Sequence, residues 1–232
     1  MISRELARAL ERVAAGLGER RSEFVFVGGA VAGLLVTDPA APAPRPTKDV
    51  DLVVDVPTPL EWFNLSGFLR KQGFAEDPDG PICRWDLAGQ RVDVMPARGD
   101  NVLGFTNRWY VTAMGAAQDV ALETGGSIRV IAAVHFLATK LEAFDARGKG
   151  DYVASHDLED VLAIVDGRPS LVAELESAAD EAAVFVRRRL GELTSDASFL
   201  DAVAGHLPGD SASQRRVPIV LARLRSIASG RS

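Results

Sequence analysis

The chain has 232 residues, of which 26 are Lys or Arg and 32 are Asp or Glu, so its formal net charge at pH 7 is −6. This acidic balance excludes a globally basic nucleic-acid binder, and a content of 47% hydrophobic and 25% charged residues excludes a disordered or fibrous chain. A single cysteine, Cys83, excludes an intramolecular disulfide framework and a thiolate zinc cluster.

The first 22 residues predict a solvated helix and not a secretory segment. Charged side chains are spread through this stretch, which no secretory signal would tolerate. Its apolar residues recur at helical spacings of three and four: Leu6, Leu10, Val13 and Leu17. The uncharged stretch at 24–37 is shorter than the roughly 20 apolar residues that span a membrane. We therefore expect a cytoplasmic protein with no membrane partner.

Short apolar runs separated by turn residues predict a mixed α/β arrangement in the front of the chain. In chain order the pattern predicts a strand at 24–27, a helix at 30–35, a proline-rich loop at 38–47, a strand at 49–54, a helix at 59–72, a hairpin of 82–86 with 91–95, and a hairpin of 119–122 with 127–130. From residue 134 onward the apolar spacing becomes helical, so the remainder predicts helices only. Two domains follow, an α/β domain at 1–132 and a helical C-terminal domain at 133–232.

Three acidic residues on predicted strands suit a divalent cation. Asp49 and Asp51 point to one face of their strand, about 7 Å apart, because alternate side chains share a face. Asp93 lies on the first hairpin between two valines and is expected to present its carboxylate in the same way. Oxygen ligands of this kind suit Mg²⁺ or Mn²⁺, and a two-metal site can activate an attacking hydroxyl and stabilise a leaving phosphate oxygen.

Two further features suit a triphosphate. Gly28 and Gly29, between a strand and a helix, would let backbone amides approach phosphate oxygens. Lys140 and Arg147 are seven residues apart on a predicted helix, so both lie on one face and could grip β- and γ-phosphates.

The string FVFVGGA at 24–30, followed by RPTKDVDL at 45–52, resembles the nucleotidyltransferase superfamily that shares the DNA polymerase β palm. More narrowly, it is similar to the AbiEii-type toxin branch, whose pattern is Gly-Gly, a helix and Arg-x-Thr/Ser-x-Asp-x-Asp. That branch has a Lys on a downstream helix and an Asp-x-x-Asp pair on the next helix, which match Lys140 and Asp157 with Asp160. The glycine-rich connection stretches the spacing from the Lys, so the alignment of Asp157 against Asp160 stays open.

The resemblance implies an α/β (α+β) nucleotidyltransferase palm with a mixed sheet, followed by a helical C-terminal domain. It implies an NTP substrate, Mg²⁺ or Mn²⁺ held by Asp49, Asp51 and Asp93, and transfer of a nucleoside monophosphate to an acceptor. The implied catalytic residues are Asp49, Asp51, Asp93, Lys140 and Asp157. The implied nucleotide-binding residues are Gly28, Gly29, Thr47, Lys140, Arg147 and Asp160.

The acceptor stays open at this point. In some relatives of the toxin branch it is the 3′ end of tRNA, which implies an RNA partner and an antitoxin protein. A small molecule such as an aminoglycoside is an alternative, because the acidic bulk of the protein would attract a cation. A third alternative is a nucleotide-binding component of a toxin–antitoxin pair without turnover. The arginines at 187–189 and near the C terminus are candidates for an RNA-docking surface.

Overall fold

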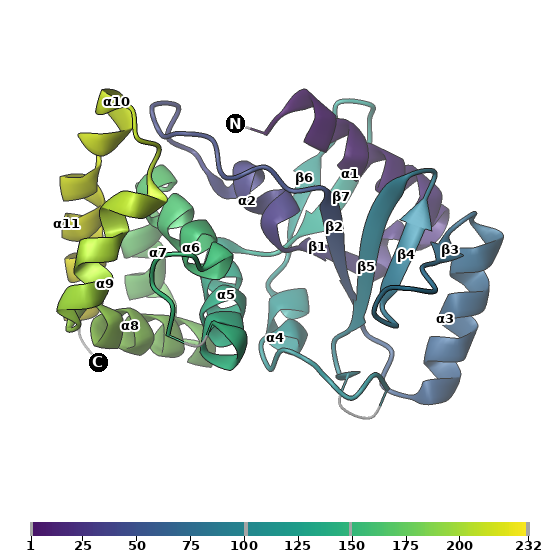
Figure 1. Ribbon diagram of the computed structural model, residues 1–232. Helices are drawn as coiled ribbons and strands as arrows, with labels where there is room; N and C mark the ends of the chain where they lie inside the picture. The colour runs from purple at the N-terminus through teal and green to yellow at the C-terminus, as the bar shows by residue number, and fades with distance from the viewer. Residues whose placement is uncertain (1, 100–101, 149, 231–232) are drawn as a thin grey trace. The chain divides into compact units, whose positions relative to one another are not determined.

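The computed structural model describes residues 2–99, 102–148 and 150–230, which form two compact units. We call Ile2–Val31 with Pro46–Ala132 the sheet unit, and Ala32–Arg45 with Ala133–Ser232 the helical unit. The helical unit therefore contains a segment from the front of the chain in addition to the C-terminal helices. Figure 1 gives the labels of the helices and strands that are used below.

A mixed sheet is the centre of the sheet unit. Its seven strands among the described residues are β1 (Phe24–Val27), β2 (Asp49–Val54), β3 (Ala75–Glu76), β4 (Arg84–Leu87), β5 (Gln90–Pro96), β6 (Gln118–Ala121) and β7 (Ser127–Val130). They lie in the order β3-β4-β5-β2-β1-β7-β6. The pairs β2/β5 and β1/β7 are parallel, whereas β1/β2, β3/β4, β4/β5 and β6/β7 are antiparallel. This mixed sheet confirms the predicted fold class.

Side-chain caps fix the start of the two longest helices in the sheet unit. The unit contains α1 (Arg4–Leu17), the 3-10 helix η1 (Gly18–Glu23), α3 (Pro59–Lys71) and α4 (Tyr110–Gly115). The Ser3 side chain accepts a hydrogen bond from the Leu6 amide at the start of α1. Thr58 and Glu61 form a capping box at the start of α3. Of the predicted apolar stripe of α1, Leu10, Val13 and Leu17 are buried and Leu6 is half-buried.

The strand β1 is buried along its whole length and leads through Gly28 into α2 (Gly29–Leu35). This is the strand, glycine turn and helix that the sequence predicts. The next strand, β2, alternates between half-buried and buried residues over its first four positions, with Val50 and Leu52 fully buried. Alternation of this kind places one face of the strand in the core and leaves the other accessible.

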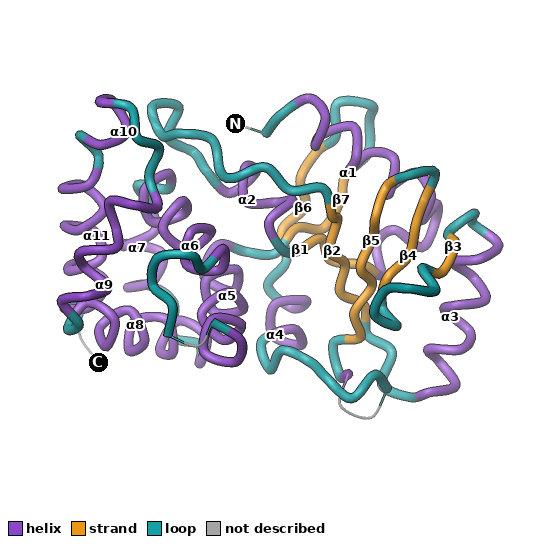
Figure 2. Tube along the Cα trace, viewed as in Figure 1, coloured by secondary structure: helices purple, strands orange, loops and turns teal. Residues whose placement is uncertain are grey.

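The helical unit contains α5 (Ala133–Arg147), α6 (His156–Gly167), α7 (Leu171–Ser177), α8 (Glu181–Thr194), α9 (Ala197–Ala202), the 3-10 helix η3 (Val203–His206), α10 (Ser211–Gln214) and α11 (Val217–Ser229). Figure 2 shows no strand in the described part of this unit, as the helical spacing after residue 134 predicts. Throughout the described residues, every helix is too short or too polar to cross a membrane.

Hydrogen bonds and an ion pair fasten residues 32–45 to the helices of the same unit. The amides of Thr37 and Asp38 donate to the carbonyl of Gly167 at 2.8 and 2.9 Å. Arg216 donates to both carboxylate oxygens of Asp166, at 2.8 and 2.9 Å, and to Asp38 Oδ2 at 2.6 Å. Asp166 is buried, and burial raises the pKa of its carboxyl, an effect that Arg216 partly offsets.

Replacing Arg216 with Met is expected to destabilise the protein by about 3 kcal/mol near pH 7, because the buried Asp166 carboxylate loses its guanidinium partner. An acid whose folded-state pKa is raised binds its proton more tightly in the folded state. Acidification should therefore favour folding and reduce the difference in unfolding free energy between Arg216→Met and wild type. Urea unfolding at about pH 7 and about pH 5 measures both effects. Arg215→Met removes an exposed neighbouring arginine and should stay within about 0.5 kcal/mol of wild type. Equal losses of unfolding free energy in Arg216→Met and Arg215→Met would contradict the assignment of Arg216 as the stabilising partner of Asp166.

Candidate functional site

The acids Asp49, Asp51 and Asp93, here called the strand acids, lie on the paired strands β2 and β5. The parallel pairing places Asp51 opposite Asp93 and Asp49 opposite Arg91. The valines that alternate with the acids, Val50, Val92 and Val94, are fully buried. Because successive side chains point to opposite faces, the strand acids share the face of the sheet that is turned away from this core. The structure thus places the three carboxylates that the sequence singles out on one face of the sheet.

Arginines pair with two of the strand acids. Arg84 on β4 donates to both oxygens of Asp93, at 2.8 and 2.9 Å, and Arg91 donates to Asp49 Oδ1 at 3.2 Å. Hydrogen bonding to Asp93 raises the pKa of Arg84, so this guanidinium stays charged. The sequence reasoning did not single out Arg84. Its register opposite Asp93 in the β4–β5 hairpin is the signal that identifies it.

Gly28 is required where β1 turns into α2. Its φ is +68°, and a Cβ atom at this position would lie 1.8 Å from Oδ2 of Asp51. Its carbonyl accepts from the Val31 amide at 3.3 Å in the first turn of α2, which Gly29 begins. The Asp51 carboxylate therefore lies directly against the backbone of the turn, a close approach that a side chain would block. Thr47 acts nearby, where its hydroxyl accepts from the Asp49 amide at 3.4 Å.

The strand acids fit a divalent cation by donor chemistry and by register. Carboxylate oxygens are the ligands that Mg²⁺ prefers, and the guanidinium groups of Arg84 and Arg91 show that Asp93 and Asp49 attract a cation. In their present rotamers, however, no three His, Cys, Asp or Glu side chains among the described residues are grouped so that they could hold a metal ion. In this arrangement Asp93 is paired with Arg84 and Asp49 with Arg91.

Cys83 is not a nucleophile under neutral conditions. The residue is buried, and burial raises the pKa of its thiol to about 11, with a further contribution from the Asp93 carboxylate. The thiolate form, which is the reactive one, is therefore scarce near neutral pH. A buried and protonated thiol is poorly suited to act as a nucleophile.

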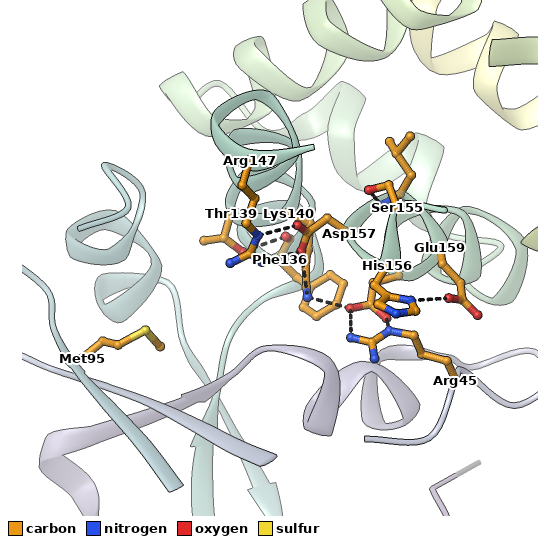
Figure 3. Close-up of polar contacts among 12 residues, drawn as sticks. Arg45, Met95, Phe136, Thr139, Lys140, Arg147, Ser155, His156, Asp157 and Glu159 are labelled. Carbon is orange, nitrogen blue, oxygen red and sulfur yellow. Dashed lines mark hydrogen bonds and ion pairs between the residues drawn. The ribbon is translucent and has the colours of Figure 1, made fainter. Parts of the chain in front are cut away.

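A second cluster of predicted site residues lies in the helical unit. We call it the α5–α6 network, and it consists of Arg45, Lys140, Arg147, Asp157 and Asp160. Figure 3 shows the side chains of Lys140, Arg147 and Asp157 pointing toward one another, with Arg45 nearby. The Lys140 ammonium lies 2.6 Å from Asp160 and 3.4 Å from Asp157. Arg147 donates two hydrogen bonds to Asp157, both of 2.9 Å, and Arg45 donates to Asp160 at 3.0 and 3.3 Å.

Helical periodicity explains why these residues meet. Lys140 and Arg147 are two turns apart on α5, and Asp157 and Asp160 are three residues apart at the start of α6, after the N-cap Ser155. Burial raises the pKa of Asp157, but the bonds and charges of Arg147 and Lys140 outweigh it, so the pKa is lowered overall. The carboxylate is therefore ionised at neutral pH.

The network also includes a residue whose role the sequence reasoning missed. Arg45 is part of the motif RPTKDVDL, yet no role was assigned to it, and its partner Asp160 is 115 residues away. The side chain of Asp160 is 1% exposed and that of Arg147 is 70% exposed. Asp160 is thus an internal member of the network, whereas the guanidinium of Arg147 is accessible.

The arginines at 187–189 make bonds within the helical unit. Arg189 pairs with Asp145 at 2.8 Å and Arg188 with Glu192 at 2.6 Å. Arg187 donates to the backbone carbonyls of Leu175 and Ala178. Acidic partners therefore neutralise two of the three charges, which weakens this stripe as an RNA-docking surface.

Replacing Gly28 with Ala is expected to cost about 3 kcal/mol of folding stability, from the positive φ together with displacement of Asp51. Gly73→Ala isolates the first of these two costs, because Gly73 has a φ of +88° and open space around its Cβ position. That variant should lose only about 1 kcal/mol. Thermal or urea unfolding of both variants makes the comparison, and equal losses would show that Asp51 does not lie against the turn.

Replacing Asp157 with Asn is expected to cost about 2 kcal/mol near pH 7, because charge-assisted bonds to Arg147 and Lys140 are lost. A carboxyl whose pKa is lowered by folding stabilises the protein above its unfolded pKa, and this stability disappears as the pH falls through the folded pKa. The difference in unfolding free energy between Asp157→Asn and wild type should therefore disappear below about pH 4. Urea unfolding across this range tests it, with the exposed Asp201→Asn as control. A gap that stays constant with pH would contradict the expectation.

No protein-family model matches the chain, and no curated protein matches it in sequence. Among solved structures, it resembles the crystal structure of an antigenic nucleotidyltransferase-like protein from Paracoccidioides brasiliensis, at 18% identity and a TM-score of 0.51, over 88% of this chain and 93% of that chain. It is also similar to the solution structure of the antibiotic-resistance factor ANT(2'')-Ia, at 16% identity and a TM-score of 0.47, over 78% of this chain and 88% of that chain. The first likeness shows a shared fold: the chain has the fold of a nucleotidyltransferase-like protein.

Proposed function

We propose that the chain is a metal-dependent nucleotidyltransferase, which transfers a nucleoside monophosphate from an NTP to an acceptor hydroxyl. The observation that carries this proposal is the register of β2 and β5, which places Asp51 beside Asp93 with Asp49 on the same face. Gly28 lies against Asp51 in this arrangement, and the fold is of the nucleotidyltransferase-like kind. Fold alone does not define chemistry, so the strand acids are what favour this activity.

In this proposal Asp49, Asp51 and Asp93 hold Mg²⁺ or Mn²⁺. The bound ion would supply charge neutralisation for the triphosphate and a lower pKa for the acceptor hydroxyl. Asp93 accepts the proton of that hydroxyl, whose oxygen bonds to the α-phosphorus while the α–β phosphoanhydride bond breaks and pyrophosphate leaves. For these roles Arg84 must release Asp93 and Arg91 must release Asp49, which their partial solvent exposure permits.

The α5–α6 network is proposed to serve the anionic part of the nucleotide. Its three cations exceed its two acids by one charge, and the accessible guanidinium of Arg147 is suited to phosphate oxygens. Lys140, whose side chain is 11% exposed and held by two carboxylates, is proposed to position the triphosphate with the help of Asp157. Gly28 and Gly29 leave the backbone of their turn open to the triphosphate.

Two acceptor classes follow from different observations. The motif resemblance favours an RNA 3′ end and a toxin-like role with an antitoxin partner, and both remain predictions. The net charge of −6 favours a cationic small molecule such as an aminoglycoside, as does the pairing of the arginines at 188 and 189 with acids. A nucleotide-binding component without turnover remains the third alternative.

The test incubates purified protein with each α-labelled NTP and Mg²⁺, together with total RNA in one arm and an aminoglycoside in another. The double variant Asp49→Ala/Asp51→Ala should lose transfer by more than about a hundredfold, because the metal contributes several kcal/mol to catalysis. It should also lose binding of Mn²⁺ in calorimetry. The control Asp119→Ala/Glu123→Ala removes two exposed acids from the same unit and should keep both properties.

Circular dichroism is used to check that the double variant remains folded. Transfer that persists in a folded Asp49→Ala/Asp51→Ala protein would overturn the assignment of the strand acids. Label on a tRNA-sized band supports the RNA acceptor, and label on the antibiotic supports the small-molecule acceptor. Nucleotide binding without any labelled product would favour the component without turnover.

A further inference from the structure

A cavity of about 720 Å³ lies in the sheet unit, between α3 and the residues that lead from β3 into β4. We call it the α3 pocket. Its apolar lining comes from aromatic and proline side chains with one isoleucine: Trp62, Phe63, Pro78, Pro81, Ile82 and Trp85. Its volume lies within the range of known small-molecule sites. Nothing in the motif resemblance assigns a role to this pocket.

Two of the lining side chains are exposed to an extent that is unusual for large apolar residues. Phe63 is 69% exposed and Ile82 is 64% exposed, and they come from different elements, Phe63 from α3 and Ile82 from the loop before β4. Exposed apolar groups that meet around a cavity are typical of a ligand site. Aromatic rings in such a place favour a flat ring as the ligand.

The loop wall is held in shape by its own backbone bonds. The Asp77 amide donates to the Arg84 carbonyl at 3.1 Å, and the Arg84 amide donates to the Pro81 carbonyl at 2.8 Å. A Cβ on Gly80 would lie 2.8 Å from Asp77 Oδ2 and 2.9 Å from Arg84 Cδ, so the side chains of Asp77 and Arg84 pack closely around this position. A wall that is already ordered costs less conformational entropy when a ligand binds.

The charges around the pocket balance. Two arginines, Arg70 and Arg84, are matched by Glu76 and Asp77, and the arginines are already paired, Arg70 with Glu76 at 2.6 Å and Arg84 with Asp93 at 2.8 Å. A balanced lining favours an uncharged ring over a polycation or a free phosphate. Carboxylates and guanidiniums at its rim also suit a ring whose edge carries hydrogen-bond donors and acceptors.

Arg84 connects the pocket to the strand acids. Its side chain lines the cavity, and its guanidinium holds both oxygens of Asp93. A ring in the pocket would therefore lie one side chain away from the group proposed to accept the acceptor's proton. We propose that the α3 pocket binds a nucleobase, an uncharged heteroaromatic ring, as part of the acceptor. The description of the ring as part of the acceptor rests on the proposed function. The binding of the ring itself does not depend on metal or on transfer.

The test measures binding of uncharged nucleosides, and separately of a short RNA with a free 3′ end, in the presence of EDTA. Two of the three tryptophans in the chain line the pocket, so tryptophan fluorescence reports on its occupancy. Phe63→Ala should weaken nucleoside binding about tenfold, the effect of removing one stacking partner. Leu60→Ala is the matched control, because Leu60 is also on α3 and 69% exposed but does not line the pocket.

Loss of affinity in Phe63→Ala together with retention in Leu60→Ala supports the proposal. If the RNA shows the same loss, the base belongs to an RNA end, and if only nucleosides do, it belongs to a free nucleoside. Equal affinities in wild type and Phe63→Ala, equal losses in both variants, or no saturable binding would overturn it. So would sedimentation showing that Phe63→Ala only dissociates a dimer. If nucleosides bind as expected but no NTP transfer occurs, the proposed function fails while the pocket stands.

Discussion

The candidate site depends on the register of β2 between β1 and β5. Val27 of β1 and Asp93 of β5 both stand opposite Asp51, so the strand is fixed from both sides. A shift of the register by one residue would turn the carboxylates into the core and the valines outward. The burial of unpaired carboxylates would strongly destabilise the fold. The hydrophobic face of β2 therefore determines where its acids lie, and stability and site geometry have the same origin.

Ion pairs between aspartate and arginine recur in both units, but their burial differs. The Asp93 side chain is 15% exposed and that of its partner Arg84 is 23% exposed, whereas Asp160 and Asp166 are exposed by 1% and 3%. Exchange of one cation for another is cheap where water can enter and costly where it cannot. The pairs of Asp160 and Asp166 are accordingly suited to a fixed structure, and the pair between Arg84 and Asp93 is suited to exchange.

Much of this arrangement could be predicted from local patterns. Alternation of apolar and acidic residues indicates β2, and the paired glycines indicate the turn before α2. Elements with little pattern were missed: β3 has two residues, and α4 begins without a side-chain cap. The predicted strand at 82–86 starts later, at Arg84, because a backbone bond from Arg84 to Pro81 keeps 81–84 in a turn.

Contacts between distant residues lay beyond the sequence reasoning for a different reason. The bond between Arg45 and Asp160, and the contact of Asp38 with Arg216, join residues more than a hundred positions apart. No periodicity links such residues, because each pair is brought together only by packing of the whole unit. Arg84 is a different case, because the register of the predicted hairpin already places it opposite Asp93.

The presence of Ala32–Arg45 in the helical unit affects the order in which the two units fold during synthesis. The 87 residues at 46–132 belong to the sheet unit and separate this segment from the helices that it joins. On the ribosome, residues 32–45 emerge early but find their partners, Asp160 and Arg216, only after the rest of the sheet unit has been made. Folding of the sheet unit can thus begin during translation, whereas the helical unit closes last. A fragment that starts at 133 would lack Arg45, so Asp160 would keep Lys140 as its partner but lose both hydrogen bonds from the guanidinium.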